Sequence, residues 1–212
     1  MNTIKFTCVV LLLILLSFTV NAQWKSLGPS VGAGLSMVSN NDEIVDVNPQ
    51  FLWNAGATFV YSTKNHLGFG ADLKYSSEGY KVQFAFFGST FDINVHLNYL
   101  RLPVRVIYCF GDYGGHIRPK IFLGLTPGLL LSAKEDDGTE NFDIKDSLST
   151  FDLGAQGGVG VNIRLMEGVW LNTDIGIYQG FLDLGDSDES ILNRNVAVNV
   201  GVAFGIGNKT KE

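Results

Sequence analysis

Acidic side chains are grouped in two stretches of this chain, and carboxylates are the groups that hold hard divalent cations. The first group is Glu135, Asp136 and Asp137, and the second is Asp186, Asp188 and Glu189. Oxygen donors of this kind suit calcium or magnesium, but neither stretch has the regular spacing of a calcium-binding loop. We therefore interpret the acids as solvated groups of outer loops, with cation binding as the alternative.

A second set of ionisable residues carries both signs of charge along the polar face of alternating segments. Its members are Asp72, Lys74, Arg101, Arg105, Lys120, Asp152, Arg164 and Asp174. Because these positions alternate with apolar ones, they share one face of extended strands. Buried charges persist when they are paired and hydrogen-bonded, so we predict a structural ion-pair network. A gated ion path or a small-ligand site on the same face is the alternative.

No catalytic, metal or nucleotide motif accompanies these charges. The histidines His66, His96 and His116 lack the spacing of metal ligands. The best Ser/His combination for a hydrolase, Ser89 with His96, is weak. No helix pattern follows the glycine-rich runs, as a phosphate loop would require, and a net charge of -6 opposes nucleic-acid binding. We predict no catalytic residue, no cofactor, no metal and no nucleic-acid partner.

The segments that must position these residues alternate apolar and polar side chains. They cover residues 30–37, 52–63, 67–77, 95–110, 117–133, 150–165, 169–179 and 195–206. Most reach the roughly 9–11 tilted residues that cross a membrane as a strand. The gaps between them are alternately long and short, which is typical of a meander with long loops on one side of a bilayer. The predicted fold is all-β: an eight-stranded antiparallel up-and-down transmembrane β-barrel, whose interior is just wide enough to be filled by side chains.

The fourth of these segments changes phase. Its apolar residues occupy odd positions up to Tyr99 and even positions from Leu100 onward. A β-bulge near Tyr99 and Leu100 would reconcile the two halves. Without one, Arg101 and Arg105 would face lipid, at a cost of about 2–4 kcal/mol each near the midplane.

The first residues predict the compartment. Residues 1–22 have the polar start, short apolar run and small-x-small ending of a secretory signal peptide, which leaves 23–212 as one barrel domain. Removal of the signal leaves Cys109 as the single cysteine, so no internal disulfide forms. Most acids lie in the long gaps, and both termini lie on the short-turn side. We expect a Gram-negative outer-membrane protein with periplasmic termini.

Four motifs resemble the PorT-like outer-membrane β-barrel family of Bacteroidetes-type bacteria. They are Asn-Ala-Gln at 21–23, Tyr-Leu-Arg-Leu-Pro-Val at 99–104, the glycines and proline of 124–128, and Phe-Asp-Leu-Gly with two further glycines in 151–160. The resemblance implies an outer-membrane barrel without agreed catalytic residues, in a family whose founding member supports protein secretion. The chain departs from barrels that end on an aromatic residue, because it continues for eight residues after Phe204.

These observations favour a non-enzymatic barrel that contacts outer-membrane lipid, is monomeric, and binds protein partners of a secretion or envelope complex. A small channel or ligand-binding barrel is the second hypothesis. The third is an exported soluble barrel of lipocalin type, which would place its apolar side chains inside rather than in lipid.

Overall fold

The computed structural model describes residues 24–206, except for 40–45, 64, 87–88, 113, 139 and 186–190. The predicted signal peptide at 1–22 and the chain end at 207–212 lie outside the described residues. Within them, no helix is long and apolar enough to cross a membrane.

Ten antiparallel strands form one sheet in this described part of the chain. They are β1 (Trp24–Ser39), β2 (Asp46–Ser62), β3 (Leu67–Phe86), β4 (Ser89–Arg101), β5 (Val104–Cys109), β6 (Ile117–Asp136), β7 (Asn141–Asp143), β8 (Phe151–Met166), β9 (Val169–Gly180) and β10 (Leu192–Ile206). A short 3-10 helix, η1 (Lys145–Ser147), follows β7.

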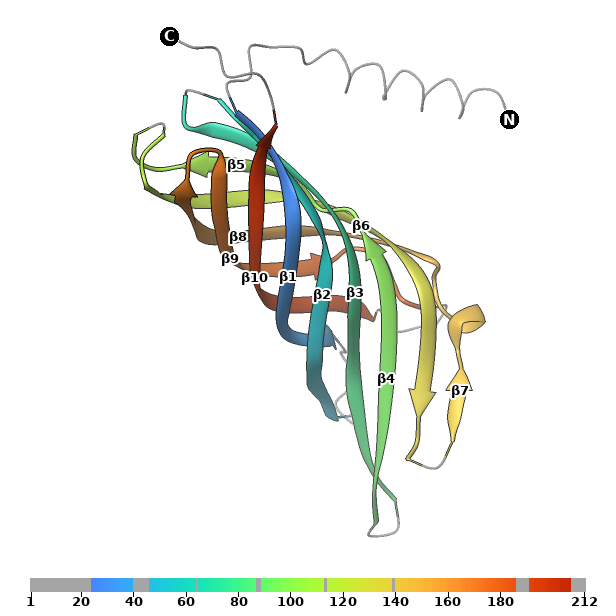
Figure 1. Ribbon diagram of the computed structural model, residues 1–212. Coiled ribbons are helices and arrows are strands. Elements are labelled where there is room, and N and C mark those ends of the chain that lie inside the picture. Colours follow the sequence, from blue (N-terminus) through green and yellow to red (C-terminus); the bar gives the residue numbers. More distant parts are fainter. Residues whose placement is uncertain are drawn as a thin grey trace, which may run out of the picture.

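The sheet closes into a barrel because the first and last strands pair, with Lys25 opposite Ile206 (Figure 1). Its wall has eight positions, as the sequence predicted, although the strands number ten. β4 and β5 occupy one position together, since both pair with β3 and β6. β7 pairs only with the end of β6, outside the ring.

The break between β4 and β5 falls at Leu102 and Pro103. Proline has no N–H to donate to a ladder, which limits regular pairing at that point. The wall nevertheless remains hydrogen-bonded there. The Leu102 amide donates to the Pro127 carbonyl at 2.9 Å, and the Asp72 amide donates to the Pro103 carbonyl at 2.9 Å.

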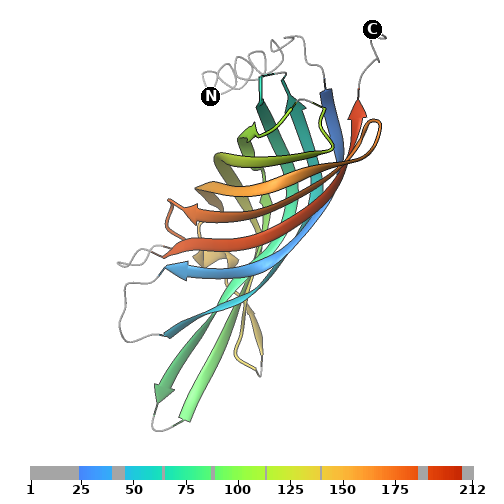
Figure 2. The ribbon, with the colours of Figure 1, turned by 90° about the vertical axis from the view of Figure 1, so that its left-hand side faces the viewer.

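The two ends of the barrel differ in their connections. β8 and β9 are joined through Glu167 and Gly168, and Gly168 adopts a φ of 78°, a left-handed conformation that favours glycine in a tight turn. At the opposite end, the β3–β4 hairpin projects beyond the rest of the wall (Figures 1 and 2). The predicted long gap at 78–94 is therefore wrong for most of its length, because β3 continues to Phe86 and β4 starts at Ser89.

Apolar side chains cover the outside of the barrel. Val31 is 59% exposed, Leu123 68% and Ile177 62%. The residues opposite them in the alternation are polar and buried, including Asp72, Arg105 and Asp152. This distribution is the reverse of a soluble ligand-carrying barrel, so the lipocalin-type hypothesis is wrong. The outer surface is one that lipid can cover.

The predicted phase change in the fourth segment is also wrong. Val95, Leu97 and Tyr99 are buried inside the barrel, in the same phase as Arg101 and Arg105. The β3–β4 register runs without interruption, and the irregularity lies across from Asn98 and Tyr99 in β6, where Leu131 is the extra residue. The inner face changes from apolar to charged residues at Arg101, while the phase of the alternation stays the same. The arginines therefore face inward like the apolar residues before them.

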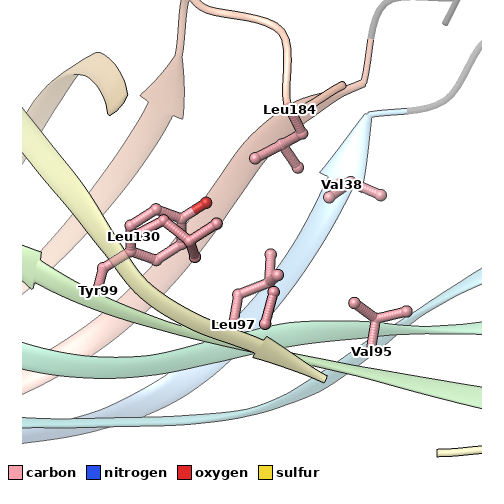
Figure 3. Packing of buried hydrophobic residues seen from close by; sticks show 7 residues of the cluster. Val38, Val95, Leu97, Tyr99, Leu130 and Leu184 are labelled. Atoms are coloured by element: carbon pink, nitrogen blue, oxygen red, sulfur yellow. The ribbon is translucent and has the colours of Figure 1, made fainter. Parts of the chain in front are cut away.

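An apolar cluster explains this change of composition. Val38, Val95, Leu97, Tyr99, Leu130, Ala133 and Leu184 pack together at the long-loop end (Figure 3). Ile144 and Leu148 from the β7–β8 segment and Ile191 near β10 pack against this cluster. The long connections thus contribute apolar side chains to the mouth of the barrel. We call this group the mouth cluster.

Candidate functional site

The interior of the barrel holds two groups of charged side chains. The Arg101 cluster consists of Glu78, Arg101, Asp152, Tyr178, Asn193 and Asn195. The Arg105 cluster consists of Asp72, Lys74, Arg105, Lys120 and Asp174. Two neighbouring wall positions supply residues to both clusters, because side chains of the same phase share the inner face of a strand. Asp72 and Glu78 lie on the inner face of β3. Arg101 and Arg105 lie on the inner face of the adjacent β4–β5 position.

Arg101 binds two carboxylates at once. Its Nε and Nη2 donate to the two oxygens of Glu78 at 2.8 and 2.7 Å, which is a bidentate pair. Its Nη1 donates to Asp152 Oδ2 at 2.7 Å. The guanidinium also lies 4.2 Å from the ring centroid of Tyr99 and 4.6 Å from that of Tyr178, within the range of cation–π attraction.

Neutral side chains complete the Arg101 cluster. The Tyr178 hydroxyl and Asn193 Nδ2 donate to Asp152 Oδ2 at 2.9 and 2.8 Å. Asn195 Nδ2 donates to Glu78 Oε2 at 2.8 Å. Each carboxylate therefore receives hydrogen bonds from the arginine and from at least one neutral donor. Several hydrogen bonds of this kind stabilise buried charges, although Asp152 Oδ1 itself has no partner among the described residues.

The Arg105 cluster is more loosely connected. Arg105 Nη2 donates to both oxygens of Asp72 at 2.8 Å, and the Thr58 hydroxyl donates to Asp72 Oδ1 at 2.6 Å. The other contacts between charges are longer: 3.6 Å from Lys74 Nζ to Asp72, 3.6 Å from Arg105 Nη1 to Asp174, and 3.5 Å from Lys120 Nζ to Asp174. Asn199 bridges the group, accepting from Lys74 Nζ at 2.9 Å and donating to Asp174 at 3.1 Å.

A cavity of about 80 Å³ is lined by members of both clusters, among them Lys74, Glu78, Arg101 and Arg105. Apolar side chains lie on either side of it along the lumen. The mouth cluster closes the long-loop end, and a smaller apolar cluster of Val60, Ile107, Cys109 and Phe122 lies inside the barrel toward the short turns. The interior is filled by side chains, as eight wall positions require.

Seven of the eight residues predicted to face the lumen are buried in these clusters, and their charges lie within ion-pair distance of one another. Arg164 lies elsewhere, half-buried near the end of β8, where its Nη2 is 3.2 Å from His116 Nδ1. Sequence reasoning missed Glu78, which it assigned to a loop, and Arg118, which is 5% exposed. Both have the inward phase of their neighbours, Asp72 and Lys120, and that phase was the available signal.

The acidic stretches are only partly described. Glu135 and Asp136 belong to β6 rather than to a loop, because that strand continues long enough to pair with both β4 and β7. Asp137 follows it and is exposed. Asp186, Asp188 and Glu189 lie outside the described residues, and so does the side chain of Ser89. Among the described residues, no three His, Cys, Asp or Glu side chains are grouped so that they could hold a metal ion.

A closed antiparallel barrel with an apolar outer belt and a polar interior is the architecture of a transmembrane β-barrel. Residues 21–186 match the family described as outer membrane protein beta-barrel domain, and this match covers more than half of the chain. The protein therefore belongs to that family and is an outer-membrane protein. No curated protein matches the chain in sequence.

Solved structures are similar in fold. The outer membrane protein OprG from Pseudomonas aeruginosa is 11% identical, with a TM-score of 0.55 over 88% of this chain and 98% of OprG. A major outer membrane protein from Thermus thermophilus is 15% identical, with a TM-score of 0.49 over 85% and 99% of the two chains. Neisserial surface protein A is 17% identical, with a TM-score of 0.48 over 84% and 97%. The likeness to OprG supports the barrel fold alone.

Proposed function

We propose that the protein is a monomeric, non-enzymatic outer-membrane barrel that acts through contacts of its surface, binding protein partners of an envelope or secretion complex. The observation that supports this most is the filled interior. Among the described residues, the Arg101 cluster, the Arg105 cluster and the mouth cluster occupy the lumen in series, which leaves little room for a solute to pass. The remaining surfaces for function are the loops and rims.

The wall that projects at the long-loop end suits such contacts because its outer face is polar. Gln83 Nε2 donates to Asp92 at 2.8 Å, and Asn48 Nδ2 donates to Gln83 Oε1 at 3.1 Å. Asn98 Nδ2 donates to Ser132 at 2.9 Å on the same projecting wall. Hydrogen-bonded polar groups on an outer face are typical of a sheet in water rather than in lipid. We place this end outside the cell and the short turns and termini in the periplasm.

Conductance of the purified protein in planar bilayers tests the filled interior. We expect no stable single-channel steps, because the paired charges and the mouth cluster exclude a water column. Large, long-lived steps would overturn the interaction proposal and favour the small channel, the second candidate, which the central cavity of about 80 Å³ supports.

Affinity capture from detergent-solubilised membranes tests the partner. The informative comparison is between the full-length protein and a variant in which residues 138–147, which include β7 and η1, are replaced by a short Gly/Ser turn. A matched control replaces the β8–β9 turn at Glu167 and Gly168 with another two-residue turn. Partners lost only from the first variant would bind the long-loop end. Capture of no specific envelope protein by any of the three would contradict the proposal.

Protease added to intact cells tests the orientation. We expect cleavage within 134–149 and 180–194, which carry the long connections. Resistance at both segments, while a known surface protein is cut, would reverse the assignment of the two ends.

A further inference from the structure

The charges of the two clusters balance across the central cavity. Among the described members, three cations face two carboxylates in the Arg105 cluster, and two carboxylates face one guanidinium in the Arg101 cluster. Both clusters line the same cavity of about 80 Å³. The positive excess of one cluster therefore offsets the negative excess of the other, and the cavity between them needs no ion to neutralise it.

Polar atoms around this cavity nevertheless lack partners. Thr126 Oγ1, Gln156 Nε2 and Asn195 Oδ1 are buried without a hydrogen-bond partner among the described residues, and all three residues line the cavity. Asn54 Oδ1 and Arg105 Nε lack partners on the same cavity. Both donors and acceptors occur in this set. Because an unpaired buried polar group is costly, the set favours a neutral ligand that can donate and accept at once.

Two smaller cavities lead from the central one toward the short turns. The first has a volume of about 20 Å³ and shares Lys74 and Asn199 with the central cavity. The second has a volume of about 30 Å³ and shares Asn162 and Asn172 with the first. It is also lined by Gly114, in the turn between β5 and β6. The three cavities are thus adjacent in series, from the short turns to the Arg101 cluster.

The size and lining of the smaller cavities select the ligand. Each holds a particle of the size of a water molecule, and the central cavity holds several. Ser30 Oγ, Asn162 Oδ1 and Asn172 Nδ2 line the smaller cavities and lack partners in the described part of the chain. Water forms two to four hydrogen bonds at such buried polar sites. Water therefore fits all three cavities by volume and by chemistry.

The long-loop side of the Arg101 cluster has a different lining. The mouth cluster there consists of apolar side chains and Tyr99, packed against one another (Figure 3). Leu97 and Tyr99 are both 0% exposed, whereas Tyr178, which lines the central cavity, is 7% exposed. Apolar cavities stay dry because water finds no hydrogen-bond partner in them. The change in lining at Arg101 therefore marks a boundary for water.

We propose that the lumen holds bound water from the short turns to the Arg101 cluster and is dry beyond it. The water molecules pair with the polar atoms that protein groups leave without partners. In the central cavity they lie between a cluster with a positive excess and one with a negative excess. They link the two clusters into one neutral hydrogen-bonded network.

Radiolytic labelling tests the boundary with two tyrosines of the same chain. X-ray irradiation of the protein in lipid nanodiscs generates hydroxyl radicals from water, including bound water, and mass spectrometry gives the oxidation rate of each ring. We expect Tyr178, at the central cavity, to be oxidised several-fold faster than Tyr99, in the mouth cluster. Equal protection of the two rings, or faster oxidation of Tyr99, would overturn the proposal.

Thermal unfolding in the same nanodiscs tests the hydrogen bonds to water. Thr126→Val nearly keeps the shape of the side chain and removes a hydroxyl that lacks a partner among the described residues. If water binds this hydroxyl, its loss should lower the midpoint by roughly 2–4 °C, whereas removal of an unpaired group from a dry cavity would raise it. Thr58→Val, which removes a hydroxyl that donates to Asp72 at 2.6 Å, is the matched control and should also lower the midpoint. A midpoint for Thr126→Val at or above that of the wild type would contradict bound water.

A crystal structure that resolves ordered solvent supplies the direct readout. We expect water-sized density within hydrogen-bond distance of Thr126 Oγ1 and Gln156 Nε2. A central cavity without ordered solvent, or with density for a larger solute, would overturn the assignment of water to the cavity.

Discussion

The two charged clusters inside this barrel compensate buried charge in different ways. In the Arg101 cluster, one guanidinium is held by two carboxylates at 2.7–2.8 Å, and neutral donors add further hydrogen bonds to these carboxylates. In the Arg105 cluster, a single arginine nitrogen donates to both oxygens of Asp72, and the other contacts between charges are 3.5–3.6 Å long. Filling a lumen with ion pairs therefore does not by itself give every buried charge a close hydrogen-bond partner. We expect the first cluster to respond to substitution as a rigid unit and the second to tolerate change in its cations.

Replacing Arg101 should have the largest effect. Arg101→Met removes the only cation of its cluster and leaves Glu78 and Asp152 buried without a counter-charge, a loss that we expect to destabilise the barrel by about 3–5 kcal/mol. Urea unfolding from lipid vesicles, followed by tryptophan fluorescence, measures it. Arg164→Met, at the half-buried end of β8, is the matched control. A loss below about 1 kcal/mol for Arg101→Met would remove the distinction between the clusters.

Replacing Asp72 should have a smaller effect. Asp72→Asn keeps the size of the side chain but leaves Arg105 with Asp174 at 3.6 Å as its carboxylate partner. Hydrogen bonds to charged groups contribute about 1.5–3 kcal/mol, so we expect a loss of about 2 kcal/mol in the same assay. Asp92→Asn, on the exposed face of β4, should change stability by less than about 0.5 kcal/mol. An equal loss in both variants would contradict the assignment.

Removing a neutral donor sharpens the comparison further. Tyr178→Phe keeps the ring beside Arg101 and deletes the hydroxyl that donates to Asp152 at 2.9 Å. Since Arg101 and Asn193 still donate to Asp152, we expect a loss of about 1 kcal/mol. No measurable loss would mean that the neutral donors do not compensate the negative excess.

The smallest effect is expected for Lys120→Gln in the same assay. Because Arg105 and Asn199 also contact Asp174, the free energy of unfolding should fall by less than about 1 kcal/mol. A loss of about 2 kcal/mol or more under these conditions would show that Lys120 is a required partner of Asp174. The two clusters would then be alike.

The alternation of side chains predicted the wall of this barrel and most of its interior. Positions such as Asp72, Lys74 and Asp174 could be assigned because each sits in a run where lipid-facing and inward residues differ sharply in polarity. Where that contrast ends, the prediction failed. Beyond the apolar belt, the outer face of β4 carries His96 and Asn98 while its inner face is apolar, so a constant geometry looked like a change of phase.

Pairing between charges could not be predicted from the sequence. Arg101 and Asp152 are 51 residues apart, and the distance between their side chains depends on how far each strand is shifted against its neighbour. Glu78 was missed for a related reason: the polar residues around it resemble a loop, yet β3 continues through them because β2 and β4 pair with it. The register and length of a strand depend on the strands paired with it, so the residues of that strand alone do not specify them.

The pairing of β1 with β10 has a consequence for biogenesis. The ring of hydrogen bonds is complete only when the last strand meets the first, with nearly the whole described chain between them. Until then, β1 and the most recently formed strand present open edges, which readily recruit other chains. Contacts this distant in sequence also make closure a slow step. The ordering of the last fifteen residues of the wall, Leu192–Ile206, therefore determines when the nascent barrel ceases to be prone to aggregation.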